Sequence, residues 1–533
     1  MGKLKVGWAE RDITTREPCY IPGHFNMRIS EGVIDPLSTT ALVVEGDGDL
    51  AIFLSIDCVV IRSFLLDEIR GKVKRKNPEI PYMKILANAT HAHTTPSHYY
   101  DGGPIDDSIK AFYTEEELEQ SLAEYKLSSL IDVPRDGMPV ASSDAYRDFL
   151  SDQAADAICE AYGKRSEAGI AYGYGFAVVA HSRRTVYLDD YGKRPNVELN
   201  SLTSLHGHAV MYGATRDDQF SHYEAGADHF LNVLYTFDSA GRLTGAVINI
   251  PCPSQNSEGE ANRRLTADFW QDIKKAIRAR HGAIRILTQS AAGGDLSPRL
   301  LHYKEAQLRR FNLKYGNEGE DLSKRVEEMA RRDIGERVAW AFDEILGWAG
   351  KDIRVDLPVR HVVRTVQLSR RLITDEEYAL AQNELAALEK EPYRFDQGSP
   401  KANLDYNSIL QSKRNRFTKV IRRYEKQQAS PKLPMELHAI QIGDIAFASN
   451  RFELYMDYQH RIQARSPFMQ TFVVQLSGQP GMDGGTYLCT ERARQGKGYS
   501  ASMFCNEVSV EGGQELVNET LKILESLKAA DAT

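Results

Sequence analysis

Two apolar stretches decide the fold, LAIFLSIDCVV at residues 50–60 and MKILANATHAHT at residues 83–94. Between them, residues 63–75 carry apolar side chains at helical spacing. Strand, helix, strand and polar loop in this order form the βαβ pattern of an α/β fold. The pattern places His91 and His93 at the carboxyl end of a strand, where open α/β sheets hold their ligands.

Similar signals recur further along the chain. A hairpin is predicted over residues 231–250, a helix over 266–280 and a strand over 283–287, which leads into a polar loop. Strand signals return after residue 434, and a last helix is predicted over 515–529. The sequence therefore predicts an α/β fold built on a mixed sheet.

The composition changes between residues 301 and 432, where Glu, Lys, Arg, Leu and Ala prevail at helical spacing. We interpret residues 301–432 as a mostly helical insertion and residues 1–300 and 433–533 as the α/β catalytic domain. Two charge runs in the insertion, at 413–416 and 422–426, are predicted to form a solvated helix face.

The overall composition limits the class of partner. The 533 residues include 66 basic and 74 acidic side chains, and the resulting net charge of −8 argues against nucleic acid. No apolar run approaches the roughly 20 residues of a membrane helix, and no signal-peptide pattern opens the chain. The six cysteines lie far apart with no CxxC pair, as in a reduced cytoplasmic protein. We expect a cytoplasmic protein with a small-molecule substrate and no integral membrane segment, and the sequence leaves a homo-oligomer open.

Histidine pairs are the strongest candidates for chemistry. On an extended segment His91 and His93 point to the same side, and imidazoles serve as zinc ligands or as acids and bases. His206 and His208 form a second pair, and together the two pairs would make a metal site between distant loops. The alternative is structural, with both pairs in ordinary surface loops or turns.

Two further segments carry polar side chains in suggestive places. Asp295 and Ser297 lie in a glycine-rich turn after a strand, where a hydroxyl can act as a nucleophile if a metal or a base activates it. As an alternative, Ser297 caps a helix ahead of Pro298. The pair Arg183 and Arg184 suits a bidentate contact with a substrate carboxylate, or an ion pair within the protein.

The carboxyl-terminal part adds an acid and two tyrosines. Glu453 follows a strand, Tyr487 follows a glycine-rich turn at 483–485, and Tyr499 lies among glycines. The glycines suggest loops that bring these side chains to one site.

Taken together, these segments resemble the catalytic N-terminal domain of the neutral/alkaline, non-lysosomal ceramidase family. The resemblance is carried by Gly7 to Thr14, by the Ala-Thr-His-x-His motif at Ala89 to His93, by Gly294 to Pro298 and by the segment from Gln463 to Gly513. It covers roughly residues 1–300 and 436–533, and it is that of a divergent, bacterial-type member.

The resemblance implies a zinc-dependent amide hydrolase and a role for each matching residue. His91, Glu453 and Tyr487 would be zinc ligands, and His93 would be a nearby active-site histidine. Ser297 would be the nucleophile or help to activate water, and Tyr499 would stabilise the oxyanion. Arg183 joins the catalytic set as a candidate, and Arg184 and Asp295 are candidates for binding substrate.

One departure from the family pattern affects the metal. The second zinc histidine of the family should follow the strand that ends at Ile250, but no histidine occurs between there and Asn262. Losing one of two imidazoles weakens a zinc site unless another group replaces it. His206, His208 or Cys252 are the candidate replacements, with His208 taken as the fourth ligand, and the alternative is a site without a metal.

The leading hypothesis is a zinc-dependent hydrolase that cleaves an amide (N-acyl) bond in a lipid-amide or other small-molecule substrate. The alternative is a carbohydrate-active enzyme, a lyase or a hydrolase, that acts on an acidic or uronate-containing glycan with His93 and a tyrosine as acid and base. A third class is a non-catalytic binding protein on an enzyme scaffold.

Overall fold

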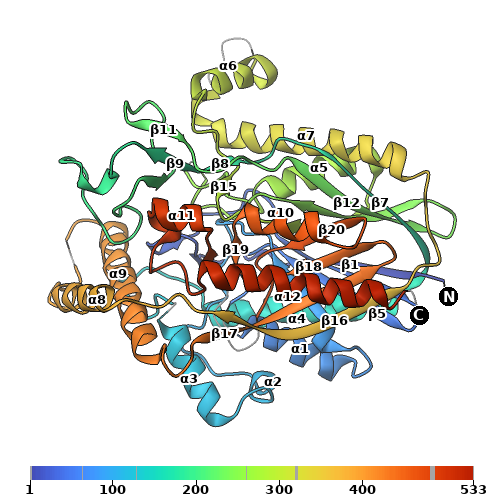
Figure 1. Cartoon of the computed structure of the whole chain (residues 1–533), viewed down its shortest axis with the longest axis horizontal. Helices are drawn as coiled ribbons and strands as arrows, with labels where there is room; N and C mark the ends of the chain where they lie inside the picture. Colours follow the sequence, from blue (N-terminus) through green and yellow to red (C-terminus); the bar gives the residue numbers. More distant parts are fainter. Residues whose placement is uncertain are drawn as a thin grey trace.

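The fold is described from a computed structural model, which covers residues 3–62, 64–127, 129–259, 261–317, 322–395, 397–479 and 486–531. The glycine-rich turn at 483–485 lies outside these residues. Within them, two sheets lie between layers of helices (Figure 1). The structure confirms the predicted mixed-sheet α/β class.

The larger of the two sheets has eight strands in the described part of the chain. In spatial order they are β14 (Arg285–Ser290), β13 (Leu243–Ile250), β12 (Phe230–Asp238), β7 (Ser166–Phe176), β1 (Lys5–Asp12), β4 (Ser38–Gly46), β5 (Asp49–Ile56) and β6 (Ile85–Ala89). The pairs β5–β6 and β13–β14 are parallel, and the pairs between them are antiparallel. The sheet is therefore mixed, with a parallel pair at each edge.

The second sheet has four strands, β16 (Val359–Ser369), β17 (Lys432–Ile442), β18 (Ile445–Ser449) and β20 (Gln470–Val474). Its pair β18–β20 is parallel, like the edge pairs of the first sheet. One apolar cluster joins the two sheets, with Phe53 4.8 Å from Phe447 between ring centroids.

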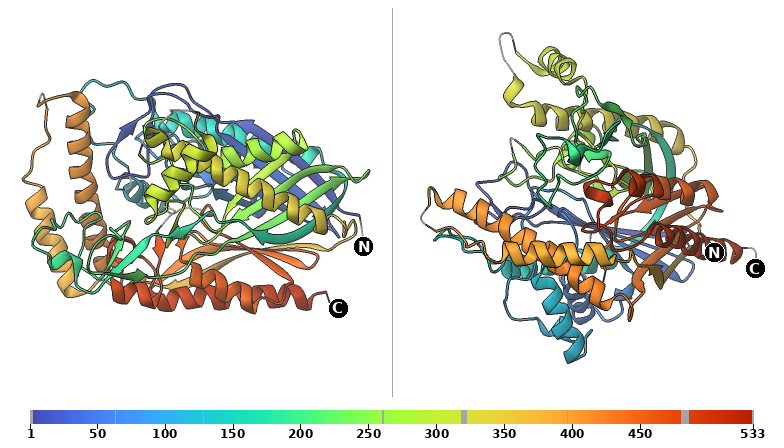
Figure 2. Two further views of the ribbon diagram at one scale, coloured as in Figure 1. Left: turned by 90° about the horizontal axis from the view of Figure 1, so that it is seen from above. Right: turned by 60° about the vertical axis from the view of Figure 1, so that its left-hand side comes forward.

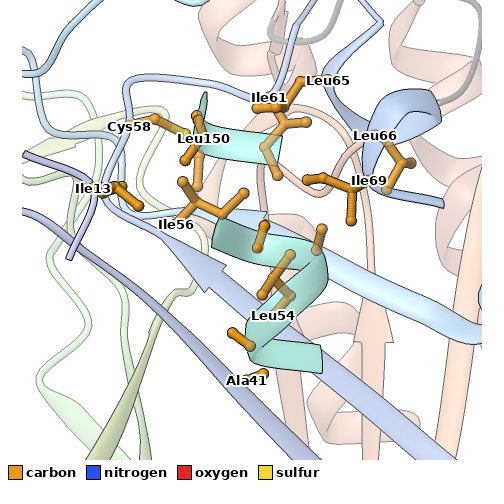
Figure 3. Packing of buried hydrophobic residues seen from close by; sticks show 14 of the residues in the cluster. Ile13, Ala41, Leu54, Ile56, Cys58, Ile61, Leu65, Leu66, Ile69 and Leu150 are labelled. Atoms are coloured by element: carbon orange, nitrogen blue, oxygen red, sulfur yellow. The ribbon is translucent and has the colours of Figure 1, made fainter. Parts of the chain in front are cut away.

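Side chains of β5 alternate between the two faces of the first sheet. Phe53 packs toward the second sheet, whereas Leu54 and Ile56 pack against helices on the other face. Figure 3 shows this second cluster, in which Ile69 of α1 and Leu150 of α4 meet the strand. A strand buried on both faces has a continuous apolar run, which explains the sequence of residues 50–56.

Helices cover the outer faces of both sheets. Figure 2 shows α7 and α12 on opposite sides, with the sheets between them and the pair α8–α9 at the end of the molecule away from both termini. The described helices of four or more residues are α1 (Leu65–Lys76), α2 (Asp107–Lys110), α3 (Glu115–Lys126), α4 (Ser143–Gly163), α5 (Phe269–His281), α6 (Lys304–Tyr315), α7 (Val326–Ala349), α8 (Asp375–Leu388), α9 (Pro400–Lys426), α10 (Met456–Arg465), α11 (Glu491–Gly496) and α12 (Val510–Ala529). None of those helices is long and apolar enough to cross a membrane.

The segment 301–432 is more closely tied to the body than a helical insertion need be. It contains α6 to α9, but it also supplies β16, whose eleven residues pair along the whole of β17. Its helix α7 packs against α5 and β7. The predicted boundaries at 300 and 433 thus fall within the sheet-and-helix layers, and the division into domains stays a prediction.

Candidate active site

The carboxyl ends of the parallel strands converge on one region. Side-chain hydrogen bonds connect the two edges of the first sheet. Ser55 of β5 and Asn88 of β6 both donate to the carbonyl of Thr288 in β14, at 2.7 and 3.0 Å. The second sheet joins the same region through the Gln475 amide, which donates to the Ser290 carbonyl at 3.0 Å. Loops that follow β6, β13, β14, β18 and β20 therefore meet at one end of the molecule.

A cavity of about 280 Å³ lies among these loops. It is lined by the predicted site residues His91, His93, Glu453, Tyr487 and Tyr499. Helix α9 forms another wall of it, with Ser412, Asn415, Arg416, Lys419, Val420 and Arg423. The charge runs on α9 were expected to face solvent, and the structure instead turns part of them toward the cavity.

His91 is held in a strained backbone conformation. Its φ is +63°, a left-handed value that non-glycine residues rarely adopt and that clusters at functional sites. Its Nδ1 lies 2.6 Å from the carbonyl oxygen of Val59 and must donate there, because that oxygen only accepts. The other nitrogen, Nε2, faces the cavity, 3.3 Å from both Glu453 Oε2 and His93 Nε2.

His93 lies between the first histidine and a second acid. Its Nε2 is 2.8 Å from Gln255 Nε2, and its Nδ1 is 2.6 Å from Glu258 Oε1. Burial lowers the pKa of His93 to about 4, although Glu258 acts in the opposite direction. The ring packs against Gly23, where a Cβ would lie only 2.7 Å from its Cγ. The site therefore holds a neutral imidazole in a tight fit.

Arg183 links several parts of the site. Its Nη2 lies 3.3 Å from both Glu453 Oε2 and the Tyr487 hydroxyl, and it donates to the Gly294 carbonyl at 2.9 Å. Its Nη1 donates to Gln255 at 2.7 Å. Burial alone would raise the pKa of Glu453. The neighbouring His91 and, to a smaller extent, Arg183 outweigh burial and lower the pKa to about 2. Glu453 is thus an ionised carboxylate with a permanent cation beside it.

Tyr499 forms part of the wall opposite His91 and His93. It begins the short 3-10 helix Tyr499–Ala501, and its ring centroid lies 5.8 Å from that of Tyr487 and 6.0 Å from that of Phe25. Burial raises the pKa of Tyr499 well above its ordinary value, so the phenol keeps its proton. A protonated phenol beside a reacting carbonyl can donate a hydrogen bond to a developing oxyanion.

His208 and Arg184 do not line the cavity. His208 is exposed, its Nδ1 is 3.3 Å from the Tyr187 carbonyl, and no contact within the described residues joins it to His91. Arg184 is fully buried and pairs through two nitrogens with Glu224, at 2.8 and 2.9 Å. The carboxylate that Arg184 holds is therefore one of the protein's own.

Asp295 and Ser297 lie behind the cavity wall. The carboxylate of Asp295 accepts from the Met456 amide at 3.1 Å, at the start of α10, and burial raises its pKa to about 6. Ser297, in the short strand β15 (Leu296–Ser297), is buried and accepts from the Arg299 amide at 3.1 Å. Neither residue lines the cavity, so their predicted roles with substrate stay predictions.

Three site residues are absent from the sequence-based set. His24 lies between β2 (Tyr20–Ile21) and β3 (Arg28–Ile29), and Gln255 and Glu258 lie in the loop after β13. Gln255 and Glu258 do not stand out in the sequence, because the family resemblance predicts a histidine in that loop. The available signal in the sequence was the position of the loop. It follows the carboxyl end of one strand and lies next to a second strand that ends at the same side.

A metal is implied by the family resemblance, and two groups of side chains can be tested against it. The predicted set of His91, Glu453, Tyr487 and His208 does not fit, because His208 lies elsewhere. In addition, the Arg183 guanidinium lies 3.3 Å from both Glu453 Oε2 and the Tyr487 hydroxyl. A cation placed there would meet a fixed positive charge.

The second group fits better. His24, His93 and Glu258 each offer one ligand atom, and these atoms lie within 4.8 Å of one another. His93 Nδ1 is buried. It lies 2.6 Å from the Glu258 carboxylate, but the angle of that contact is poor for a hydrogen bond. Two imidazoles and one carboxylate are the ligand set of many catalytic zinc sites. This His-His-Glu group could hold a metal ion.

Comparison with solved structures identifies the fold as that of the neutral ceramidases. The neutral ceramidase from Pseudomonas aeruginosa superposes with a TM-score of 0.63 at 17% identity, over 98% of this chain and 75% of that one. A ceramidase complexed with C2 gives a TM-score of 0.59 at 15% identity, over 98% and 76% of the two chains. No protein-family model and no curated protein matches the sequence. At this identity the likeness establishes the fold, and the activity has to be argued from the side chains.

Proposed function

We propose that the chain is a hydrolase that cleaves an amide (N-acyl) bond in the cavity around His91 and His93. The observation that carries the proposal is the convergence of His91, His93, Glu453, Tyr487 and Tyr499, from distant loops, on one cavity. The two solved structures compared above are ceramidases, and a ceramidase is an amide hydrolase. A lipid amide or another N-acyl amine is therefore the substrate class to test.

The side chains divide the work of amide hydrolysis between them. His91 presents its Nε2 to the cavity next to the Glu453 carboxylate, and this pair can exchange a proton with the attacking water. Tyr499 can donate a hydrogen bond to the carbonyl oxygen as negative charge develops on it. Arg183 holds Glu453 and Tyr487 in place, and these two polar side chains can orient the amide.

We further propose that the His-His-Glu group of His24, His93 and Glu258 holds the metal, with zinc as the first candidate. A divalent metal would supply a Lewis acid that polarises the carbonyl of the substrate. The group lies beside His91, because the Nε2 atoms of the two cavity histidines are 3.3 Å apart. For Ser297 the role of nucleophile stays a prediction, since its hydroxyl does not line the cavity. The glycan-directed alternative is not proposed, because the fold favours amide hydrolysis.

The proposal is tested by incubating the full-length protein with a panel of N-acyl amines and measuring release of the free amine. We expect cleavage of at least one member, and a fall of about 10²- to 10³-fold in kcat for Tyr499→Phe, since one oxyanion donor is removed. Tyr223→Phe is the matched control, because its hydroxyl bonds to His302 outside the cavity. If no amide is cleaved, or if Tyr499→Phe is as active as Tyr223→Phe, the proposal is wrong.

A further inference from the structure

A second cavity, of about 600 Å³, adjoins the one that contains the histidines. It lies between α3 and α9, two helices that are far apart in the sequence (Figure 1). Lys419, Arg423 and Glu507 line both cavities. A substrate held at His91 can therefore extend past these three side chains into the second cavity, which we call the basic cavity.

The charge of the basic cavity differs from that of the whole chain. The described residues that line it include seven basic side chains and four carboxylates, whereas the chain as a whole carries a net charge of −8. The basic residues come from α9, from the segment after β16 and from Arg451. An excess of positive charge in one concave site of an acidic protein points to a negatively charged ligand.

Within the cavity the carboxylates do not match the cations one to one. Arg422 and Lys426 share a single partner, Glu124, at 3.8 and 3.1 Å. Glu507 lies 3.9 Å from Arg451, and it also feels the charge of Arg423. Arg371 has a carboxylate partner of its own, Glu377, which does not line the cavity. The excess of positive charge therefore falls on the other lining cations.

Arg423 shows the imbalance most clearly. Among the described residues its guanidinium donates to carbonyl oxygens, those of Met503 at 2.6 Å, Asn506 at 2.8 Å and Arg371 at 3.3 Å. Burial lowers the pKa of Arg423 to about 10; Glu507 acts in the opposite direction, and Arg371 and Arg370 act in the same direction as burial. A charge-assisted bond to an oxyanion would offset that cost.

The walls of the basic cavity combine aromatic rings with charged side chains. Its apolar side chains are the rings of Phe112, Tyr113 and Tyr125, and none of the described residues that line it is aliphatic. Lipid chains are normally held in slots lined by aliphatic and aromatic side chains. The cavity is therefore a better match for a polar, charged group.

We propose that the basic cavity binds an oxyanion group of the substrate, a carboxylate, sulfate or phosphate that lies away from the scissile amide. As a statement about substrate, it rests on the proposed amide hydrolysis. Arg423, which lines both cavities, is the principal contact, and Arg370 and Arg422 complete the site. The substrate is then an anionic N-acyl amine rather than a neutral lipid amide.

The first arm of the test measures anion binding without any reaction. Sodium sulfate and sodium phosphate are titrated into the full-length protein by calorimetry, with sodium chloride holding the ionic strength constant. We expect saturable binding whose Kd rises about 10-fold or more in Arg423→Gln and is largely kept in Arg423→Lys. Arg370→Gln tests the same site without removing the bonds to Met503 and Asn506, and Arg309→Gln on the exposed face of α6 is the control for loss of one charge.

The second arm compares two amide substrates that differ only in a carboxylate. We expect KM to be about 10-fold lower for the anionic amide, with the difference abolished by Arg423→Gln or Arg370→Gln and retained in Arg309→Gln. Anion binding with no amide cleavage would overturn the proposed hydrolysis and leave the anion site standing. Cleavage with equal KM for both substrates would overturn the substrate subsite. If sulfate still binds in that case, the cavity serves a free inorganic anion.

Discussion

Replacing Arg183 with methionine is expected to lower the free energy of unfolding by about 3–5 kcal/mol, the typical cost of removing one partner from a buried ion pair. Arg183 is 1% exposed, and its guanidinium bonds to Glu453, Tyr487, Gln255 and the Gly294 carbonyl. Without it, Glu453 keeps a buried negative charge with its fixed cation gone. The change is measured by urea unfolding followed by circular dichroism.

A double variant separates the charge from the packing. Arg183→Met combined with Glu453→Gln leaves no unpaired charge, so we expect it to recover most of the lost stability. Two results would contradict this explanation: a loss below about 1 kcal/mol in the single variant, or a double variant no more stable than the single one.

The second large effect is expected on catalysis. His93→Ala should lower kcat/KM for the amide by about 10²- to 10⁴-fold, because His93 contacts His91, Gln255 and Glu258 at the centre of the site. His208→Ala is the matched control, since that histidine is exposed and outside the cavity. We expect its activity to stay within about twofold of the native value. Equal losses in the two variants, or more than a tenth of the activity left in His93→Ala, would show that the cavity is not the catalytic site.

The backbone around the histidines was predictable because it depends on local patterns. The strands and helix predicted between residues 50 and 94 correspond to β5, α1 and β6, and His91 and His93 follow β6 as expected. Apolar residues at a spacing of two, or at helical spacing, indicate which side of a strand or helix is buried. Such elements can therefore be predicted without knowing the fold. The spacing argument for His91 was right about the two rings meeting, but it assumed an extended segment, whereas His91 has a left-handed φ of +63°.

The side chains that complete the site were not predictable, because tertiary packing selects them. Neighbouring residues of an extended chain face opposite ways, so Arg183 reaches Glu453 while Arg184 pairs with Glu224, and the sequence does not say which arginine contacts Glu453. His24 and Glu258 come together only when loops after β2 and β13 meet. The role of α9 was unpredictable for the same reason. In the sequence its charge runs resemble a solvated helix face, and only the tertiary structure shows α3 and the cavity beside them.

We propose that Arg183 supplies the positive charge beside Glu453, while His24, His93 and Glu258 hold the metal. It is tested most directly by the zinc content of purified native protein, Glu258→Gln and Glu453→Gln, measured by mass spectrometry after growth with zinc. The account predicts about one equivalent of zinc in the native protein and in Glu453→Gln, and almost none in Glu258→Gln. Zinc that stays in Glu258→Gln and is lost from Glu453→Gln would contradict it.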